Sequence, residues 1–164
     1  MQIPACAQDA TDIFEQSTVV CPNGGDVNGY TTIEAMNSDM ILELDKIRAG
    51  KPSEEPYIFV LCPDTDFDAS AVALTPLLSG AVFSCGTMGD PSSACSFVGG
   101  ANQVLIEDSA SVPNYELQMV SFIGVTFTGF KNAAISGNAG SNTTVDLYRS
   151  NFEVREKDIF PLIL

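Results

Sequence analysis

Histidine and tryptophan are absent from this sequence of 164 residues. Without histidine, the chain lacks the usual general base and the commonest metal ligand, which excludes a Ser-His catalytic triad and leaves a zinc site poorly supplied. Without tryptophan, an aromatic platform for a sugar would have to be built from tyrosine or phenylalanine. These two absences remove several of the commonest catalytic and binding arrangements.

Basic residues are scarce, because 7 Lys and Arg stand against 21 Asp and Glu and give a net charge of -14. Such a chain repels phosphate backbones and anionic membrane surfaces, so we expect neither as a partner. The sequence also has no apolar run long enough to span a bilayer, and its start, "MQIPACAQDATDIF", lacks the regions of a signal peptide. The net charge of the chain is compatible with the binding of divalent cations and of neutral or cationic partners.

Cysteine is the exception to this scarcity of reactive groups, although no CxxC pair occurs. The spacing of the cysteines favours disulfides in a secreted protein. Because the number of cysteines is odd, one thiol has no partner within the chain. Cys85 and Cys95 bracket the turn-rich stretch "GTMGDPSSA" and would close a small loop, whereas Cys62 is a rival partner for Cys85. The pairing of Cys6, Cys21 and Cys62 stays open.

The triplet Asn142-Thr143-Thr144 is a glycosylation sequon in a loop rich in Gly, Ser and Asn. We therefore predict Asn142 as a glycosylation site, which agrees with a secreted or cell-surface location.

Residues 32–48 have the apolar period of one amphipathic helix, and turn chemistry makes residues 1–30 irregular. Thr31 or Thr32 can cap the start of the helix, and Gly50 follows its end. We divide the chain into an irregular segment 1–30, a helix in 31–50 and strands in 56–164. The expected apolar face of the helix consists of Ile33, Met36, Met40, Ile41, Leu44 and Ile47.

From residue 56 onward the apolar period changes to two, and two columns of apolar positions recur at about 23 residues. One column is Val60, Phe83, Ile106, Phe127 and Phe152. The other column is Val72, Cys95, Val120 and Val145. In the stretch "VSFIGVTFTGF" (120–130), this predicts two strands that meet at Gly124, with Val120, Phe122, Val125 and Phe127 facing inward.

A strand repeat of this length without a helix inside it predicts a parallel β-helix of about five coils, since stacked coils bury the inward side chains that one coil cannot. The amphipathic helix would then cap the open first coil. The alternative is a β-sandwich with one packed helix, because short strands at regular spacing also occur there.

The stretches "YIFVLCPDTDFD", "VFSCGTMGDPSSACSFVGG" and "VSFIGVTFTGF" resemble secreted right-handed parallel β-helix proteins of the pectate-lyase-like superfamily, in particular uncharacterised extracellular members from microbial eukaryotes. The resemblance covers about residues 31–152 and implies a right-handed stack. The polysaccharide-cleaving members have more coils, so we expect this chain to be a fragment or to have an unusual terminus. Their catalytic motifs have no counterpart here, and we predict no catalytic or cofactor-binding residue.

Two groups of charged residues are candidate sites. Asp64, Asp66 and Asp68 alternate in "PDTDFD" and could hold Ca²⁺ from one side of an extended segment, although a solvated acidic turn is the default interpretation. The EF-hand pattern fails at its glycine and glutamate positions. Asp146 and Arg149 could form an acid–base pair on an outer face, and an ordinary surface pair is the default there.

From these features we expect a non-catalytic extracellular module that binds glycans, such as cell-wall polysaccharide, or has a structural role at a cell surface. The alternative is a fragment of a carbohydrate-active enzyme, either a polysaccharide lyase or a glycoside hydrolase, and it rests on the resemblance alone.

Overall fold

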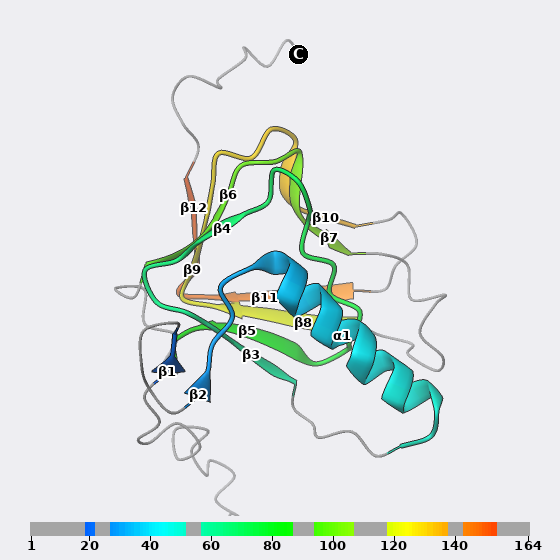
Figure 1. Ribbon diagram of the computed structural model, residues 1–164. Coiled ribbons are helices and arrows are strands. Elements are labelled where there is room, and N and C mark those ends of the chain that lie inside the picture. The colour runs from blue at the N-terminus through cyan, green and yellow to red at the C-terminus, as the bar shows by residue number, and fades with distance from the viewer. Residues whose placement is uncertain are drawn as a thin grey trace, which may run out of the picture.

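The computed structural model describes residues 19–21, 27–51, 57–86, 94–106, 118–137 and 143–153 (Figure 1). The described chain is mainly β and contains one helix. Its elements in chain order are β1 (Val19–Val20), β2 (Val27–Asn28), α1 (Ile33–Arg48), β3 (Ile58–Leu61), β4 (Asp66–Asp68), β5 (Ala81–Cys85), β6 (Cys95–Val98), β7 (Asn102–Ile106), β8 (Gln118–Ile123), β9 (Val125–Thr128), β10 (Ala133–Gly137), β11 (Thr143–Tyr148) and β12 (Asn151–Glu153).

All strand pairs in the described residues are parallel, and each sheet collects one strand from successive passes of the chain. The first sheet has the order β3-β5-β8-β11, and the second has the order β4-β6-β9-β12. The third sheet pairs β7 with β10, and an isolated bridge between Leu74 and Val104 extends it by one pass. Parallel pairing throughout does not fit a β-sandwich, whose sheets are antiparallel.

The predicted helix is confirmed as α1, and Thr32 is its N-cap, because its Oγ1 accepts a hydrogen bond of 3.2 Å from the amide of Ala35. Four of the six predicted inward residues are buried: Ile33, Met36, Met40 and Leu44. Ile47 is half-buried and packs on the core, but Ile41 is 50% exposed, so its assignment to the buried face was wrong. Ile41 lies at the margin of the apolar stripe, where side chains reach solvent.

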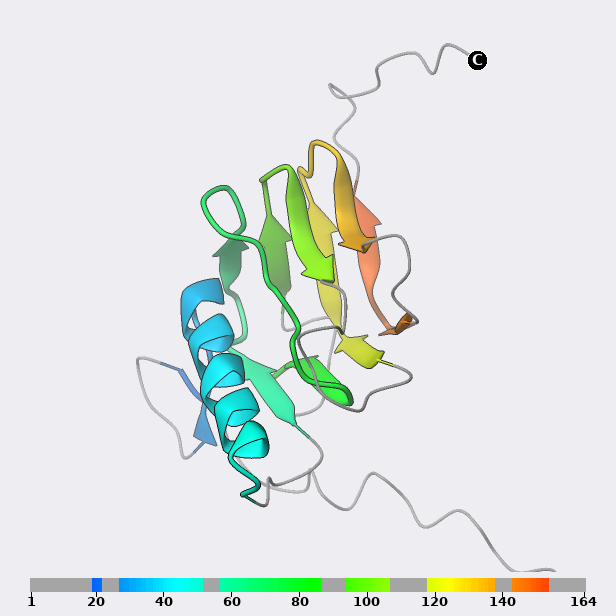
Figure 2. The ribbon, with the colours of Figure 1, turned by 90° about the vertical axis from the view of Figure 1, so that its right-hand side faces the viewer.

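The helix lies against the first pass of the chain, at the opposite end of the stack from β12 (Figure 2). Its buried residues belong to the same hydrophobic cluster as the strands. The Asn37 side chain donates 2.9 Å to the carbonyl of Ala73 and accepts 3.0 Å from the amide of Thr75. One amide side chain therefore makes the two bonds that a neighbouring strand would otherwise make to this backbone.

Two short strands, β1 and β2, lie within the segment 1–30 that the sequence predicted to be irregular. Tyr30 extends this region onto the first sheet, since its amide donates 2.9 Å to Val60 and its carbonyl accepts 2.9 Å from Cys62. Turn-forming residues dominate this segment; β1 and β2 pair with each other in parallel, and Tyr30 joins the segment to the first sheet.

Phenylalanine rings form two stacks in the core, one behind each of the first two sheets. Phe59, Phe83 and Phe122 are stacked with centroids 5.0 and 5.1 Å apart. The second stack consists of Phe67, Phe97, Phe127 and Phe152, with centroids 5.1 to 5.7 Å apart. Phe97 and Phe127 also meet Phe122 edge to face, which joins the two stacks. These contacts add to apolar burial and fix which residues lie above one another.

The register corrects most of the predicted repeat columns. Phe83 pairs with Phe59 and Phe122 rather than with Val60 and Ile106. The interval between Phe67 and Phe97 recurs between Phe97 and Phe127 and is longer than the predicted period. The predicted columns joined the wrong residues because the segments that connect the sheets differ in length from pass to pass. No constant period therefore describes the chain. Two predicted steps are confirmed: Phe127 to Phe152, and Val120 to Val145.

The facing of β3 was also predicted wrongly, because Phe59 and Leu61 are buried while Ile58 and Val60 are only half-buried. All four residues of "IFVL" are apolar, so alternation cannot decide between the two faces. In the stretch 120–130 only one parity is strongly apolar, and there Val120, Phe122, Val125 and Phe127 are fully buried, as predicted. Gly124 stands between β8 and β9 with a φ of 69°.

Candidate functional site

The three aspartates of "PDTDFD" are all exposed, but the structure does not gather them into one cluster. Asp64 lies in a turn with a φ of 55°, whereas Asp66 and Asp68 flank the buried Phe67 on the outer side of β4. Across the described residues, no group of three or more His, Cys, Asp or Glu side chains is close enough to hold a metal ion. The calcium site thus has no assembled ligand set in this part of the chain.

Asp68 has a local hydrogen-bond partner instead. Its Oδ1 accepts a 2.8 Å hydrogen bond from the amide of Ser70. Hydrogen bonds from the Ser70 side chain and backbone lower the pKa of the Asp68 carboxyl below its usual value. Asp68 therefore stays ionised to a lower pH than a free aspartate and carries a fixed negative charge at this corner.

The outer face of the second sheet carries the most regular arrangement of polar side chains. Asp66 lies beside Ser96, Ser96 beside Thr126, and Thr126 beside Asn151, each one strand further along the stack. Successive strands are about 4.8 Å apart, so these groups form a row at a constant repeat. We call this row the polar row.

A second row runs beside the polar row, two residues further along each strand. It consists of Asp68, Val98, Thr128 and Glu153. No Lys or Arg occurs in β4, β6, β9 or β12. This face therefore presents hydroxyl groups and one valine on the two middle strands, carboxylates on both edge strands and the Asn151 amide on the edge strand β12.

The outer face of the first sheet has a different character. Its outward residues Ile58, Val82 and Ile123 are half-buried, and Met119 and Tyr148 are 44% and 57% exposed. Ser121, Asp146 and Thr144 also face outward on this sheet, but Ser121 and Asp146 continue a row that begins with the apolar Ile58 and Val82. The second sheet is thus the face with the more continuous row of hydrogen-bonding side chains.

Asp146 and Arg149 do not form the acid–base pair considered from the sequence. The described residues show no ion pair between them, and the Arg149 guanidinium instead lies 5.0 Å from the centroid of the Tyr148 ring. Asp146 is exposed beside Ser121 of β8. Both residues therefore lie at the β11 edge of the first sheet, and they form no ion pair with each other.

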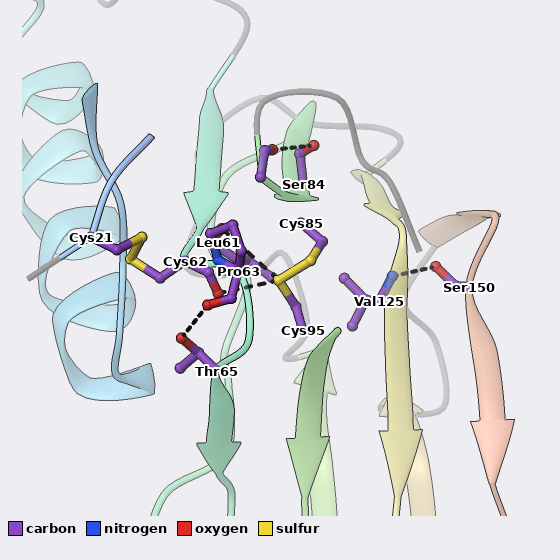
Figure 3. Close-up of a disulfide and its surroundings, with 11 residues drawn as sticks. Cys21, Leu61, Cys62, Pro63, Thr65, Ser84, Cys85, Cys95, Val125 and Ser150 are labelled. Atoms are coloured by element: carbon purple, nitrogen blue, oxygen red, sulfur yellow. Dashed lines mark hydrogen bonds between the residues drawn. A yellow bond between two sulfur atoms is a disulfide. The ribbon is translucent and has the colours of Figure 1, made fainter. Parts of the chain in front are cut away.

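Two disulfides join neighbouring segments of the stack, as Figure 3 shows. Cys85 is bonded to Cys95, and Cys62 is bonded to Cys21 rather than to its rival partner Cys85. Cys6 and the predicted glycosylation site Asn142 lie outside the described residues. The sequence could not pair Cys21 with Cys62, because their proximity depends on the segment around Tyr30 joining the first sheet.

The Cys85–Cys95 bond restores a corner that an insertion interrupts. Between β8 and β9 the chain turns from the first sheet to the second through Gly124 alone, whereas residues 86–94 separate β5 from β6. The disulfide holds the Cα atoms of Cys85 and Cys95 5.6 Å apart, so the two strands still meet at this corner. Both cysteines are fully buried, and the Cys95 sulfur lies 3.3 Å from the carbonyl oxygen of Cys62.

Replacing Cys85 and Cys95 together with alanine is expected to lower the free energy of unfolding by about 2 to 3 kcal/mol, since a loop of this length loses its closure. Equilibrium denaturation in urea measures this change. The matched comparison is the Cys21 and Cys62 double variant, whose longer loop predicts a loss of about 4 kcal/mol. Equal stability of the first variant and the parent chain would contradict the role assigned to the corner.

Comparisons with known proteins add no relative: no family model, curated protein or solved structure matches this chain. The described residues include no helix with the length and apolar character needed to cross a membrane. The polar row was missed in the sequence because the strands were aligned on the wrong residues. A signal was present, since Ser96, Thr126 and Asn151 each directly precede a phenylalanine of the second stack.

Proposed function

We propose that this chain is a secreted right-handed parallel β-helix module of about five coils that binds neutral or cationic polysaccharide on the outer face of its second sheet. The right-handed winding of the coils is proposed from the resemblance to the pectate-lyase-like superfamily. Parallel pairing of β3, β5, β8 and β11 supports four of the coils. The parallel bridge between Tyr30 and Leu61 supports a preceding fifth. Two disulfides support an oxidising compartment.

The polar row is the observation that carries the binding proposal. Side chains of similar chemistry recur there at the strand spacing, and a ligand that repeats can contact several of them at once. Each hydroxyl or amide contributes little binding free energy by itself. A polymer that contacts several of them therefore binds more tightly than a single sugar does. Polysaccharides are repeating ligands rich in hydroxyl groups, which both donate to carboxylates and accept from Thr and Asn.

Charge narrows the class of polysaccharide. Asp66 and Asp68 lie at one edge of the face and Glu153 lies at the other, and the whole chain carries a net charge of -14. Polyuronates would be repelled by this field, whereas neutral glucans and amino-sugar polymers would not. We therefore expect binding to be strongest for a cationic polymer such as chitosan and weakest for polygalacturonate.

The test is a pull-down of the full chain on insoluble chitosan, cellulose and β-glucan, with soluble polygalacturonate as the acidic comparison. A triple variant, Ser96→Ala, Thr126→Val and Thr128→Val, removes the central hydroxyls, and the two valines suit a strand as well as the threonines do. We expect at least about a tenfold loss of binding, which corresponds to roughly 1.4 kcal/mol.

The matched control is Ser121→Ala, which removes a half-buried hydroxyl from the outer face of the first sheet. This variant should bind like the parent chain. Failure of the parent chain to bind any of the polysaccharides would remove the binding proposal, and equal losses in both variants would remove its assignment to the second sheet.

A further inference from the structure

The two disulfides differ in how close they lie to solvent. Cys85 and Cys95 are both fully buried, and their bond lies among the strands, at the corner between the first and second sheets (Figure 3). Cys62 is also buried, but its partner Cys21 is half-buried and lies outside the first pass of the chain. Because access to a sulfur atom governs the rate of thiol–disulfide exchange, the Cys21–Cys62 bond is the one that an external thiol reaches first.

The Cys21–Cys62 bond is also what attaches the strands β1 and β2 to the stack. Among the described residues, these strands pair only with each other and form a separate two-stranded sheet. The next attachment along the chain is Tyr30, which bonds through its backbone to Val60 and Cys62 at the edge of β3. Within this part of the chain, the disulfide is therefore the main tie between β1–β2 and the first sheet.

Tyr30 and α1 are held in place by contacts that do not involve the disulfide. The Tyr30 hydroxyl donates a hydrogen bond of 2.8 Å to Asp39, and its ring lies 5.5 Å from that of Phe59. The helix buries its apolar face in the core and is joined to the first pass by the two hydrogen bonds of Asn37. Breaking the Cys21–Cys62 bond thus removes the tie of β1–β2 and leaves the capped stack intact.

We propose that the Cys21–Cys62 bond is a redox-sensitive clasp. A small external thiol reduces it in the folded chain and releases β1 and β2 from the edge of β3, while the Cys85–Cys95 bond stays oxidised. The inference does not depend on the proposed binding function.

The reaction consumes two molecules of the external thiol. The thiolate of the first attacks the Cys21 sulfur, forms a mixed disulfide there and displaces Cys62 as a thiolate, which takes a proton from water. The thiolate of the second attacks the external sulfur of the mixed disulfide and displaces Cys21. The protein disulfide is reduced by two electrons, and the two external thiols are oxidised to one disulfide.

Differential thiol labelling of the full chain, without denaturant, tests the selectivity. Thiols that are already free are blocked with N-ethylmaleimide, reduced glutathione is added, and new thiols are labelled with iodoacetamide and identified by peptide mass spectrometry. We expect Cys21 and Cys62 to be labelled at least about tenfold faster than Cys85 and Cys95, because only the first pair is accessible in the folded chain. Far-UV circular dichroism of the same sample should not change.

Hydrogen–deuterium exchange measures the release of the strands. After reduction we expect exchange in residues 19–21 and 27–28 to become at least about tenfold faster, whereas exchange in residues 118–128 should not change. Cys21→Ser is the matched variant, since it lacks the bond and keeps the buried Cys62. It should show the same local acceleration without glutathione, and glutathione should accelerate it no further.

The outcomes that would overturn the clasp are distinct from one another. Equal labelling of all four cysteines, faster labelling of Cys85 and Cys95, or no labelling at all would show that access does not distinguish the two bonds. Loss of the dichroism signal during labelling would show that the bond opens only when the whole chain unfolds. Unchanged exchange in residues 19–21 and 27–28 after reduction would show that nothing is released, and a new bond between Cys62 and Cys95 would show that the buried disulfide takes part.

Discussion

Replacing Phe127 with aspartate is expected to abolish folding. Phe127 is fully buried and contacts Phe97, Phe122 and Phe152, so it joins both aromatic stacks. Removing such a ring by truncation to alanine costs about 3 to 5 kcal/mol, and an unpaired buried carboxylate adds a further penalty. Domains of this size have only about 5 to 15 kcal/mol of stability in total. Far-UV circular dichroism and thermal unfolding would show the loss.

Thr126→Asp is the matched control for this substitution. Thr126 is the adjacent residue, and its half-buried side chain lies on the outer face between Ser96 and Asn151. An aspartate there stays in contact with water, and the variant should fold with a stability within about 1 kcal/mol of the parent chain. A folded Phe127→Asp variant beside an unfolded Thr126→Asp variant would show that the facing of β9 is reversed.

Gly100→Ala is expected to destabilise the chain by more than about 4 kcal/mol, which is an exceptional value for a surface turn. Gly100 has a φ of +86°, and an added Cβ would overlap the carbonyl oxygen of Ala69 and lie 2.9 Å from its carbonyl carbon. Both atoms belong to the backbone of the preceding pass, so a rotamer change cannot relieve the overlap. The two turns would have to separate, and the neighbouring bond from the Ala69 amide to the Val98 carbonyl would lengthen from 2.9 Å.

Gly99→Ala separates the two causes of this effect. Gly99 also has a positive φ, +72°, but an added Cβ would meet nothing within 4 Å. This variant should therefore lose only the conformational term, about 1 to 2 kcal/mol. Urea denaturation of both variants gives the comparison, and equal losses would show that close stacking of the turns is not what requires Gly100.

Local features of the sequence were sufficient to predict the helix α1 and the buried residues of β8 and β9. Thr32 and Gly50 mark the ends of α1 because capping and left-handed backbone conformation are local properties. In β8 and β9 only one parity of residues is strongly apolar, and this alone placed Phe122 and Phe127 in the core. The change of period near residue 56 correctly predicted that strands follow one helix, whereas the prediction of parallel pairing rested on a repeat whose register was mostly wrong.

The candidate site was less accessible from the sequence. The spacing of Asp64, Asp66 and Asp68 suggested a shared ligand set, but the turn at Asp64 leaves only the latter two on the same strand face. The polar row joins residues such as Ser96 and Thr126 that are far apart in the chain. Their adjacency follows from strand register, which backbone hydrogen bonds and ring stacking determine together.

By itself, then, the sequence determined the position of α1, the strand character of the chain after residue 56 and the inward face of 120–127, because periodicity and capping act within a few residues. Only the tertiary structure decided which strands are neighbours, which face of "IFVL" is buried and which cysteines are bonded. The reason is physical: backbone pairing carries no side-chain label, and connecting segments of unequal length remove any fixed period. Contacts between passes, above all the stacked phenylalanines, are what select one register from the many that alternation allows.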